Sequence, residues 1–142
     1  MLDCLILGDS IAVGTHMFMK ECSTYSKGGL NTHQWNKQFL NKDLSASTVI
    51  ISLGTNDHQY INTRKELEAL RAKTKAKNVF WILPMGNSPK SVVPLEDIQH
   101  IVAEIAEHHG DTVIATKRLQ ADKIHPSWAG YKELVDYIKT PQ

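Results

Sequence analysis

Short strand-like segments alternate with longer amphipathic segments along the whole chain. Residues 2–7, 23–26, 47–53, 78–83 and 112–115 predict strands, because most of them are rich in aliphatic or β-branched side chains. The intervening segments carry apolar residues at helical spacing. They predict helices over residues 11–21, 32–41 and 64–75, a helix between Pro94 and Gly110, and a last helix that begins after Ser127.

Five strands separated by helices predict a parallel sheet that is covered on both faces. Right-handed crossovers leave few topologies for such a chain. We therefore expect a three-layer α/β/α sandwich of the flavodoxin-like type, with five strands in the order 2-1-3-4-5. The length of 142 residues fits a single domain over residues 1–142.

Composition and charge exclude several classes of protein. The chain is 42% hydrophobic and 22% charged with a formal net charge of +1, which favours a globular protein without a nucleic-acid patch. No apolar run is long enough to span a bilayer. The start, Met1-Leu2-Asp3, lacks the basic region of a signal peptide, so a cytoplasmic location is expected, with assembly into a larger particle such as a virion left open. Cys4 is expected to be a buried thiol, and the two cysteines form no CxxC pair.

Polar residues follow the predicted strands at the edge where ligands bind in such sheets. Serine chemistry needs a hydroxyl, a base, a group that orients the base, and donors for the oxyanion. Ser10 supplies the hydroxyl, His125 the base, and Asp122, three residues earlier, the orienting carboxylate. The expected oxyanion donors are the backbone N–H groups of Ser10 and Gly29 and the side-chain amide of Asn56. Gly28 is the alternative to Gly29, with a shift of one residue.

Four short blocks carry a resemblance to the SGNH, or GDSL, hydrolase family. They read "GDS" around Ser10, "GG" at Gly29, "GTND" at Asn56 and "DKIHP" around Asp122 and His125, and they span nearly the whole chain in the family's order. The resemblance implies the α/β/α sandwich and an esterase-type activity. It also implies an oxyanion hole made of Ser10, Gly29 and Asn56. The sequence departs from the frequent "DGxHP" by carrying a lysine at position 123.

Structural interpretations compete with the catalytic one at several positions. Ser10 or Asp9 alone suits a helix N-cap, and Asp57 is expected to bond its own loop. His58 is expected either to line the entrance of the site or to be a solvated side chain of its loop. The three tryptophans are expected in the core, and Trp128 is the one expected to touch substrate if any does. No metal or cofactor motif is present, so neither is expected.

The substrate follows from the expected openness of the site. Connections between elements are short and none resembles a lid, which favours a small acyl group such as acetyl on a carbohydrate. A thioesterase or lysophospholipase acting on longer chains, and a binding module without turnover, are the alternatives. Residues 85–93 form a loop that is expected to shape the pocket.

Overall fold

Five parallel strands form one sheet in the spatial order β2-β1-β3-β4-β5, in a computed structural model that describes residues 3–86 and 93–140. The strands are β1 (Cys4–Gly8), β2 (Ser23–Ser26), β3 (Thr48–Ser52), β4 (Asn78–Ile82) and β5 (Thr112–Ile114). The helices are α1 (Ser10–Phe18), α2 (Thr32–Phe39), α3 (Thr63–Lys73), α4 (Leu95–His109) and α5 (Trp128–Lys139). The expected fold class and strand order are confirmed.

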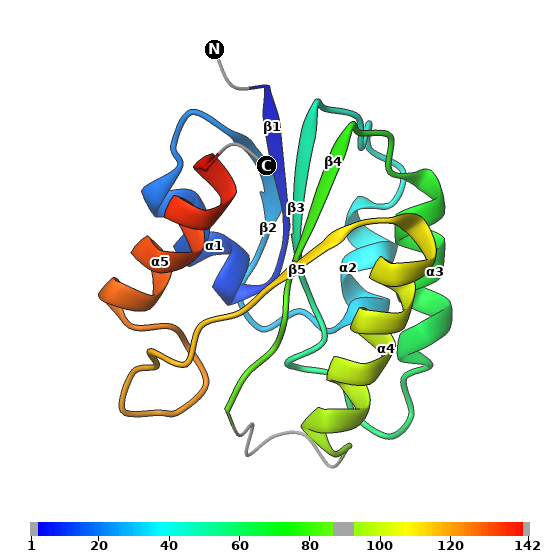
Figure 1. Cartoon of the computed structure of the whole chain (residues 1–142). Helices are drawn as coiled ribbons and strands as arrows, with labels where there is room; N and C mark the ends of the chain where they lie inside the picture. Colours follow the sequence, from blue (N-terminus) through cyan, green and yellow to red (C-terminus); the bar gives the residue numbers. More distant parts are fainter. Residues whose placement is uncertain (1–2, 87–92, 141–142) are drawn as a thin grey trace.

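Helices cover both faces of the sheet, with α1 and α5 on one face and α2, α3 and α4 on the other (Figure 1). The central strands β1 and β3 are buried along their whole length, which explains their continuous runs of aliphatic residues. Alternate residues of each strand point to opposite faces, so Ile6 and Ile50 pack under α1 and α5 while Leu7 and Ile51 pack under the other helices. Two apolar cores result, one on each face.

Element boundaries differ from the expected ones mainly at the helix ends. The first helix ends at Phe18 rather than at residue 21, because the chain must turn there toward β2. The C-terminal boundary of α4 was predicted correctly, since Gly110 adopts the left-handed conformation with φ +71° that ends helices. Of the loop expected at residues 85–93, residues 87–92 lie outside the described residues.

Two of the three tryptophans lie in the core. Trp35 and Trp81 have 0% and 1% of their surface exposed. Trp128 is 69% exposed, so the expectation of a core position was wrong for this residue. Trp128 is the first residue of α5 and lies at the molecular surface. Its neighbours cover it less completely than the core covers Trp35 and Trp81.

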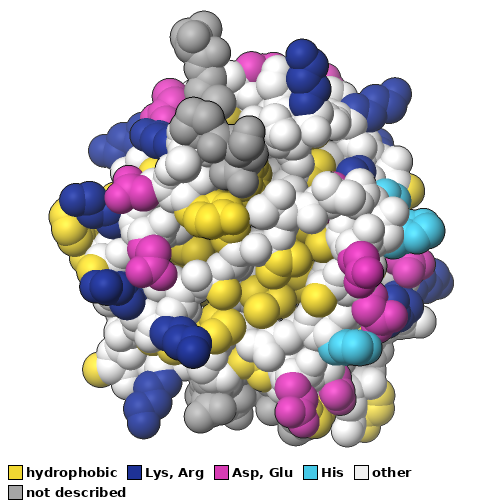
Figure 2. All heavy atoms as spheres, in the orientation of Figure 1, with side chains coloured by type: hydrophobic (Ala, Val, Ile, Leu, Met, Phe, Trp, Pro, Cys, Tyr) yellow, Lys and Arg dark blue, Asp and Glu magenta, His cyan; other side chains and the backbone are white. Residues whose placement is uncertain are grey.

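The edge strand β5 lies at the surface between α5 and α4. Apolar side chains gather over this region in Figure 2, with acidic residues and histidines mostly on the α4 side. Within residues 3–86 and 93–140, no helix is long and apolar enough to cross a membrane.

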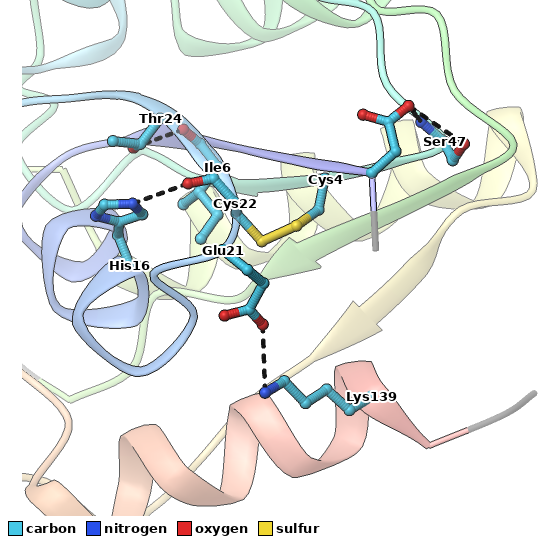
Figure 3. Close-up of a disulfide and its surroundings, with 9 residues drawn as sticks. Cys4, Ile6, His16, Glu21, Cys22, Thr24, Ser47 and Lys139 are labelled. Carbon is cyan, nitrogen blue, oxygen red and sulfur yellow. Dashed lines mark hydrogen bonds and ion pairs between the residues drawn. A yellow bond between two sulfur atoms is a disulfide. The ribbon is translucent and has the colours of Figure 1, made fainter. Parts of the chain in front are cut away.

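A disulfide joins Cys4 at the start of β1 to Cys22 just before β2 (Figure 3). The expectation that Cys4 is a thiol was therefore wrong. Leu5 pairs with Ser23 in the parallel register, so the residues one position earlier, Cys4 and Cys22, lie side by side with Cα atoms 4.8 Å apart. The bond closes a loop that contains all of α1 and Ser10.

We expect loss of this disulfide to lower the free energy of unfolding by about 3 kcal/mol, because a closed loop of this size restricts the unfolded chain. Guanidinium unfolding of the double variant Cys4→Ala/Cys22→Ala, compared with the wild type, measures the loss. Dithiothreitol should destabilise the wild type and leave the double variant unchanged. Equal unfolding midpoints for the wild type with and without dithiothreitol would contradict the assignment.

Candidate active site

The turn after β1 presents Ser10 as the first residue of α1. Asp9, rather than Ser10, is the N-cap, and its Oδ1 accepts the backbone N–H of Ile11 at 3.0 Å. The Asp9 backbone N–H donates to the carbonyl of Ser52 on β3, which fixes the turn against the centre of the sheet. The Ser10 hydroxyl therefore stands at the N-terminal end of a helix, where the dipole favours negative charge.

A chain of two hydrogen bonds connects Ser10 to His125 and Asp122. The Ser10 Oγ and His125 Nε2 atoms are 2.7 Å apart, and His125 Nδ1 and Asp122 Oδ2 are also 2.7 Å apart. An ionised carboxylate only accepts, so His125 donates from Nδ1 and its Nε2 accepts the proton of the serine hydroxyl. His125 thus lies within hydrogen-bond distance of both Ser10 and Asp122, and the structure brings together the three residues that were expected to act together.

The hydrogen bond from His125 lowers the pKa of Asp122 to about 2. The backbone N–H groups of Ile124 and His125 contribute by donating to Asp122 Oδ1 at 2.9 and 3.1 Å. Asp122 is consequently ionised throughout the neutral range, as an orienting carboxylate must be. The side chains of His125 and Asp122 are 33% and 41% exposed, so this end of the site is open to solvent.

The loop that carries Asp122 and His125 is a tight turn. Gln120 donates its backbone N–H to the carbonyl of His125 at 2.7 Å, and Lys123 donates to the carbonyl of Gln120 at 2.9 Å. Lys123 occupies the position where the family often has glycine, and it adopts φ +57°, a conformation in which glycine is favoured. The lysine therefore keeps the backbone shape that glycine would supply there.

Gly28 and Gly29 follow β2 and differ in their surroundings. A Cβ at Gly28 would lie 3.7 Å from the Cβ of Ser10, so Gly28 lies beside Ser10. Gly29 has φ +83°, and a Cβ added there would meet no atom within 4 Å, so this position favours glycine for its backbone conformation rather than for lack of room.

Asn56, in the loop after β3, donates its Nδ2 to the carbonyl of Leu30 at 3.1 Å. A carboxamide carries two N–H bonds, so this contact leaves a second one that can serve a ligand. The bond also ties the Asn56 loop to the Gly29 loop, and the two loops hold a fixed separation as a result.

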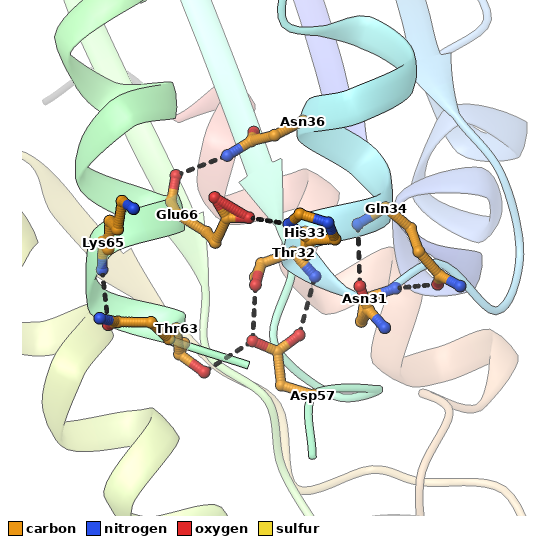
Figure 4. A network of polar contacts seen from close by, with 10 residues as sticks. Asn31, Thr32, His33, Gln34, Asn36, Asp57, Thr63, Lys65 and Glu66 are labelled. Atoms are coloured by element: carbon orange, nitrogen blue, oxygen red, sulfur yellow. Dashed lines mark hydrogen bonds and ion pairs between the residues drawn. The ribbon is translucent and has the colours of Figure 1, made fainter. Parts of the chain in front are cut away.

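Asp57 fastens these loops to two helices (Figure 4). Its carboxylate accepts the backbone N–H and the hydroxyl of Thr32 at 2.8 and 2.6 Å, and the hydroxyl of Thr63 at 2.6 Å. Asp57 does bond its own loop, since its backbone N–H donates to the carbonyl of Gly54 at 3.1 Å, but its buried carboxylate also joins the starts of α2 and α3. Its position directly after Asn56 was the only sequence signal for this role. His58 accepts the N–H of Tyr60 within its own turn.

The chain belongs to the GDSL-like lipase/acylhydrolase family, whose model matches residues 6–133. No curated protein matches the sequence. The fold is similar to that of a GDSL-like lipase from Bacteroides thetaiotaomicron, with TM-score 0.72, 15% identity, and coverage of 96% of this chain and 85% of that one.

Two further solved structures share the fold at low sequence identity. One is the catalytic domain of peptidoglycan O-acetyltransferase A from Streptococcus pneumoniae, with TM-score 0.69, 18% identity, and coverage of 96% of this chain and 90% of that one. The other is a carbohydrate acetylesterase family member from Sinorhizobium meliloti, with TM-score 0.63, 10% identity, and coverage of 97% and 98%. These likenesses establish the fold, and the family model establishes that the chain is a member of an esterase family.

Asp9 is a fully buried carboxyl group directly before Ser10. Burial raises its pKa to about 7, against the backbone hydrogen bonds and the His125 charge that act to lower it. Its Oδ2 has no hydrogen-bond partner among the described residues, which leaves the ionised form poorly stabilised. Tyr131 has a pKa raised to about 12, first by burial and then by the charges of Asp9 and Asp122.

We expect the variant Asp9→Asn to gain stability relative to the wild type as the pH rises from 5 to 8. Between about pH 4 and 7 the folded wild type retains a proton that the unfolded chain has released, so wild-type stability falls with rising pH. Asparagine keeps the N-cap and does not titrate. Urea unfolding of both proteins at several pH values measures the difference, and a difference that does not change with pH would refute the raised pKa.

Gly86 packs against the loop that carries Asp122 and His125. A Cβ at Gly86 would lie 1.8 Å from the carbonyl oxygen of Lys123, and Gly86 also has φ +82°. Gly110 offers a matched control, because it has φ +71° but no atom within 4 Å of its Cβ position.

We expect Gly86→Ala to lower esterase kcat and stability more than Gly110→Ala. Both variants strain a left-handed residue, but only the first displaces the backbone beside His125. The rate with p-nitrophenyl acetate and the melting temperature of each variant provide the measurement. Equal losses of kcat in the two variants would show that the contact with Lys123 does not position the loop.

Proposed function

We propose that this protein is a serine esterase that removes a small acyl group, acetyl in the first place, from a carbohydrate. The observation that carries the proposal is the hydrogen-bonded series Ser10–His125–Asp122, with 2.7 Å at each step. The membership in an acylhydrolase family and the fold shared with a carbohydrate acetylesterase support the same reaction class.

In the proposed reaction, His125 Nε2 takes the proton of Ser10 as Oγ attacks the acyl carbon. The imidazolium that forms is stabilised by the ionised Asp122 carboxylate, whose low pKa keeps it charged. The negative charge on the carbonyl oxygen is stabilised by the N–H groups of Ser10 and Gly29 and by Asn56 Nδ2.

Collapse of this intermediate breaks the bond to the alcohol, and His125 gives its proton to the leaving oxygen. Water then enters, loses a proton to His125, and attacks the acyl-serine. Ser10 leaves with the proton returned by His125, and the free acid is released. Each step is a proton transfer or an acyl transfer between groups of this chain, the ester and water.

The openness of the site supports a small acyl group on a large alcohol. His125 and Asp122 are both partly exposed, so a bulky leaving group can approach without a lid having to open. Longer acyl chains would need an enclosed apolar surface next to Ser10. The alternative is a thioesterase or lysophospholipase, which would act on such longer chains.

The disulfide is relevant to the compartment in which the protein acts. Disulfides persist mainly in oxidising compartments, and a buried bond between Cys4 and Cys22 favours such a compartment over the cytoplasm expected from the sequence.

A fluorophosphonate probe and a panel of substrates test the proposal. We expect the probe to label the wild type and not Ser10→Ala. We also expect rates with p-nitrophenyl esters to fall as the acyl chain lengthens, with acetylated sugars hydrolysed as well. An optimum at long chains would favour the alternative, and a protein that neither reacts with the probe nor hydrolyses any ester would be a binding module instead.

We further expect Asn56→Ala to lower kcat about a hundredfold, as removal of one oxyanion donor does in other enzymes. Asn36→Ala is the matched control, because Asn36 also donates its Nδ2 to a backbone carbonyl, that of Glu66, at 2.9 Å. The two variants are compared by steady-state kinetics with p-nitrophenyl acetate. A similar small loss in both would remove Asn56 from the proposed oxyanion hole.

A further inference from the structure

The first residue of α5, Trp128, is exposed to solvent and lies close in the sequence to His125 of the candidate site. Trp128 follows His125 by three residues and is 69% exposed, whereas Trp35 and Trp81 are buried. A contiguous exposed apolar patch commonly marks a binding surface, so the residues around Trp128 decide whether it belongs to one. The proton chemistry proposed above does not use this residue.

The indole of Trp128 is held in place by its neighbours. The ring of Phe18, at the end of α1, meets it edge-on with centroids 5.8 Å apart, and Phe18 in turn stacks on Tyr131 at 5.8 Å. The ammonium group of Lys132 lies 5.7 Å from the centre of the indole. A ring that is already fixed loses little conformational entropy when a ligand binds to it.

Two exposed apolar residues of α1 lie along the helix between Ser10 and Phe18, the residue that contacts Trp128. Val13 and Met17 are 38% and 65% exposed, and they lie three and seven positions after Ser10, which puts all three on one side of the helix. Together, Val13, Met17, Phe18 and Trp128 form what we call the α1–α5 ledge. It runs about 12 Å along α1 from Ser10 to Phe18, at 1.5 Å per residue.

The ledge lies on the leaving-group side of the site. His125 must reach the oxygen of the departing alcohol to protonate it, and α5 begins three residues after His125. The alcohol portion of the substrate is therefore expected on the α5 side, while the carbonyl oxygen lies toward Gly29 and Asn56. This step rests on the proposed function.

We propose that the α1–α5 ledge binds a sugar ring of an acetylated oligosaccharide, one or more units away from the sugar that carries the ester. The C–H-rich face of a sugar ring packs on an indole, and Lys132, whose ammonium group lies over the Trp128 ring, can donate hydrogen bonds to hydroxyl groups. The length of the ledge exceeds a single sugar ring. An oligosaccharide can reach both Ser10 and Trp128, and an acetylated monosaccharide cannot.

The variant Trp128→Ala tests this subsite. O-acetylated xylotetraose and cellotetraose, and the acetylated monosaccharides of the same sugars, serve as the substrates. We expect KM for a hydrolysed tetrasaccharide to rise about tenfold or more with kcat unchanged, and KM for its monosaccharide to stay the same. Tyr137→Ala is the control, because Tyr137 is a 48% exposed aromatic residue farther along α5.

Three outcomes would contradict the proposal that the α1–α5 ledge binds a sugar ring. They are an equal change of KM for both sugar lengths, no change for either, or a change confined to p-nitrophenyl esters of long acyl chains. The last outcome would identify an acyl-chain surface instead.

Binding without turnover separates failure of the ledge from failure of the proposed function. Unacetylated xylotetraose and cellotetraose are titrated against the Ser10→Ala variant while tryptophan fluorescence is followed, with Ser10→Ala/Trp128→Phe as the blank. We expect a saturable change that the blank lacks. If the probe and all esters fail but this titration succeeds, the proposed esterase fails and the ledge stands. If the esters are hydrolysed but the titration and the KM test show nothing, the ledge fails alone.

Discussion

The hydrogen bond between Ser10 and His125 joins two segments that are 115 residues apart, and the rest of the site depends on it. It can form only if the turn after β1 and the loop before α5 reach the same edge of the sheet. The parallel arrangement ensures this, because every strand ends at that edge. The β1 turn is in turn fixed by the hydrogen bond from Asp9 to the Ser52 carbonyl, at the centre of the sheet.

Rigid contacts surround the two halves of the site. Asp57 fixes the loop that carries Asn56 by accepting hydrogen bonds from the starts of α2 and α3. The His125 side is fixed by its own tight turn and by the close approach of Gly86 to Lys123. Neither contact involves a residue that we propose to react. These contacts support the geometry around Ser10, Asn56 and His125, which are the residues that we propose to take part in the reaction.

The fold could be predicted from the sequence because the aliphatic runs, the helical spacing of apolar residues and the signals for helix ends all agreed. Aliphatic runs such as the one ending at Gly8 were long enough to indicate buried strands, and Gly110 and Ser127 indicated helix ends that the structure has. The residues Ser10, Asp122 and His125 could be grouped because polar residues after parallel strands converge.

The features that sequence reasoning missed depend on contacts between distant segments. The pairing of Cys4 with Cys22 follows from the register of β1 and β2, which the positions of two cysteines alone do not reveal. The bonds of Asp57 and the approach of Gly86 to Lys123 likewise join different loops. Trp128 has an apolar neighbourhood in the sequence, but only the packing of α5 on α1 shows that its ring stays outside.

The placement of the chain ends has a consequence for how the protein can be used. Cys4 at the start of β1 lies near Cys22, and Lys139 at the end of α5 lies near Glu21 (Figure 3). Ser10 follows the other end of β1. A fused domain, a purification tag or a tether to a solid support could be joined at either end without covering the reactive edge. The fold thus suits an enzyme displayed on a carrier, with its working face turned outward.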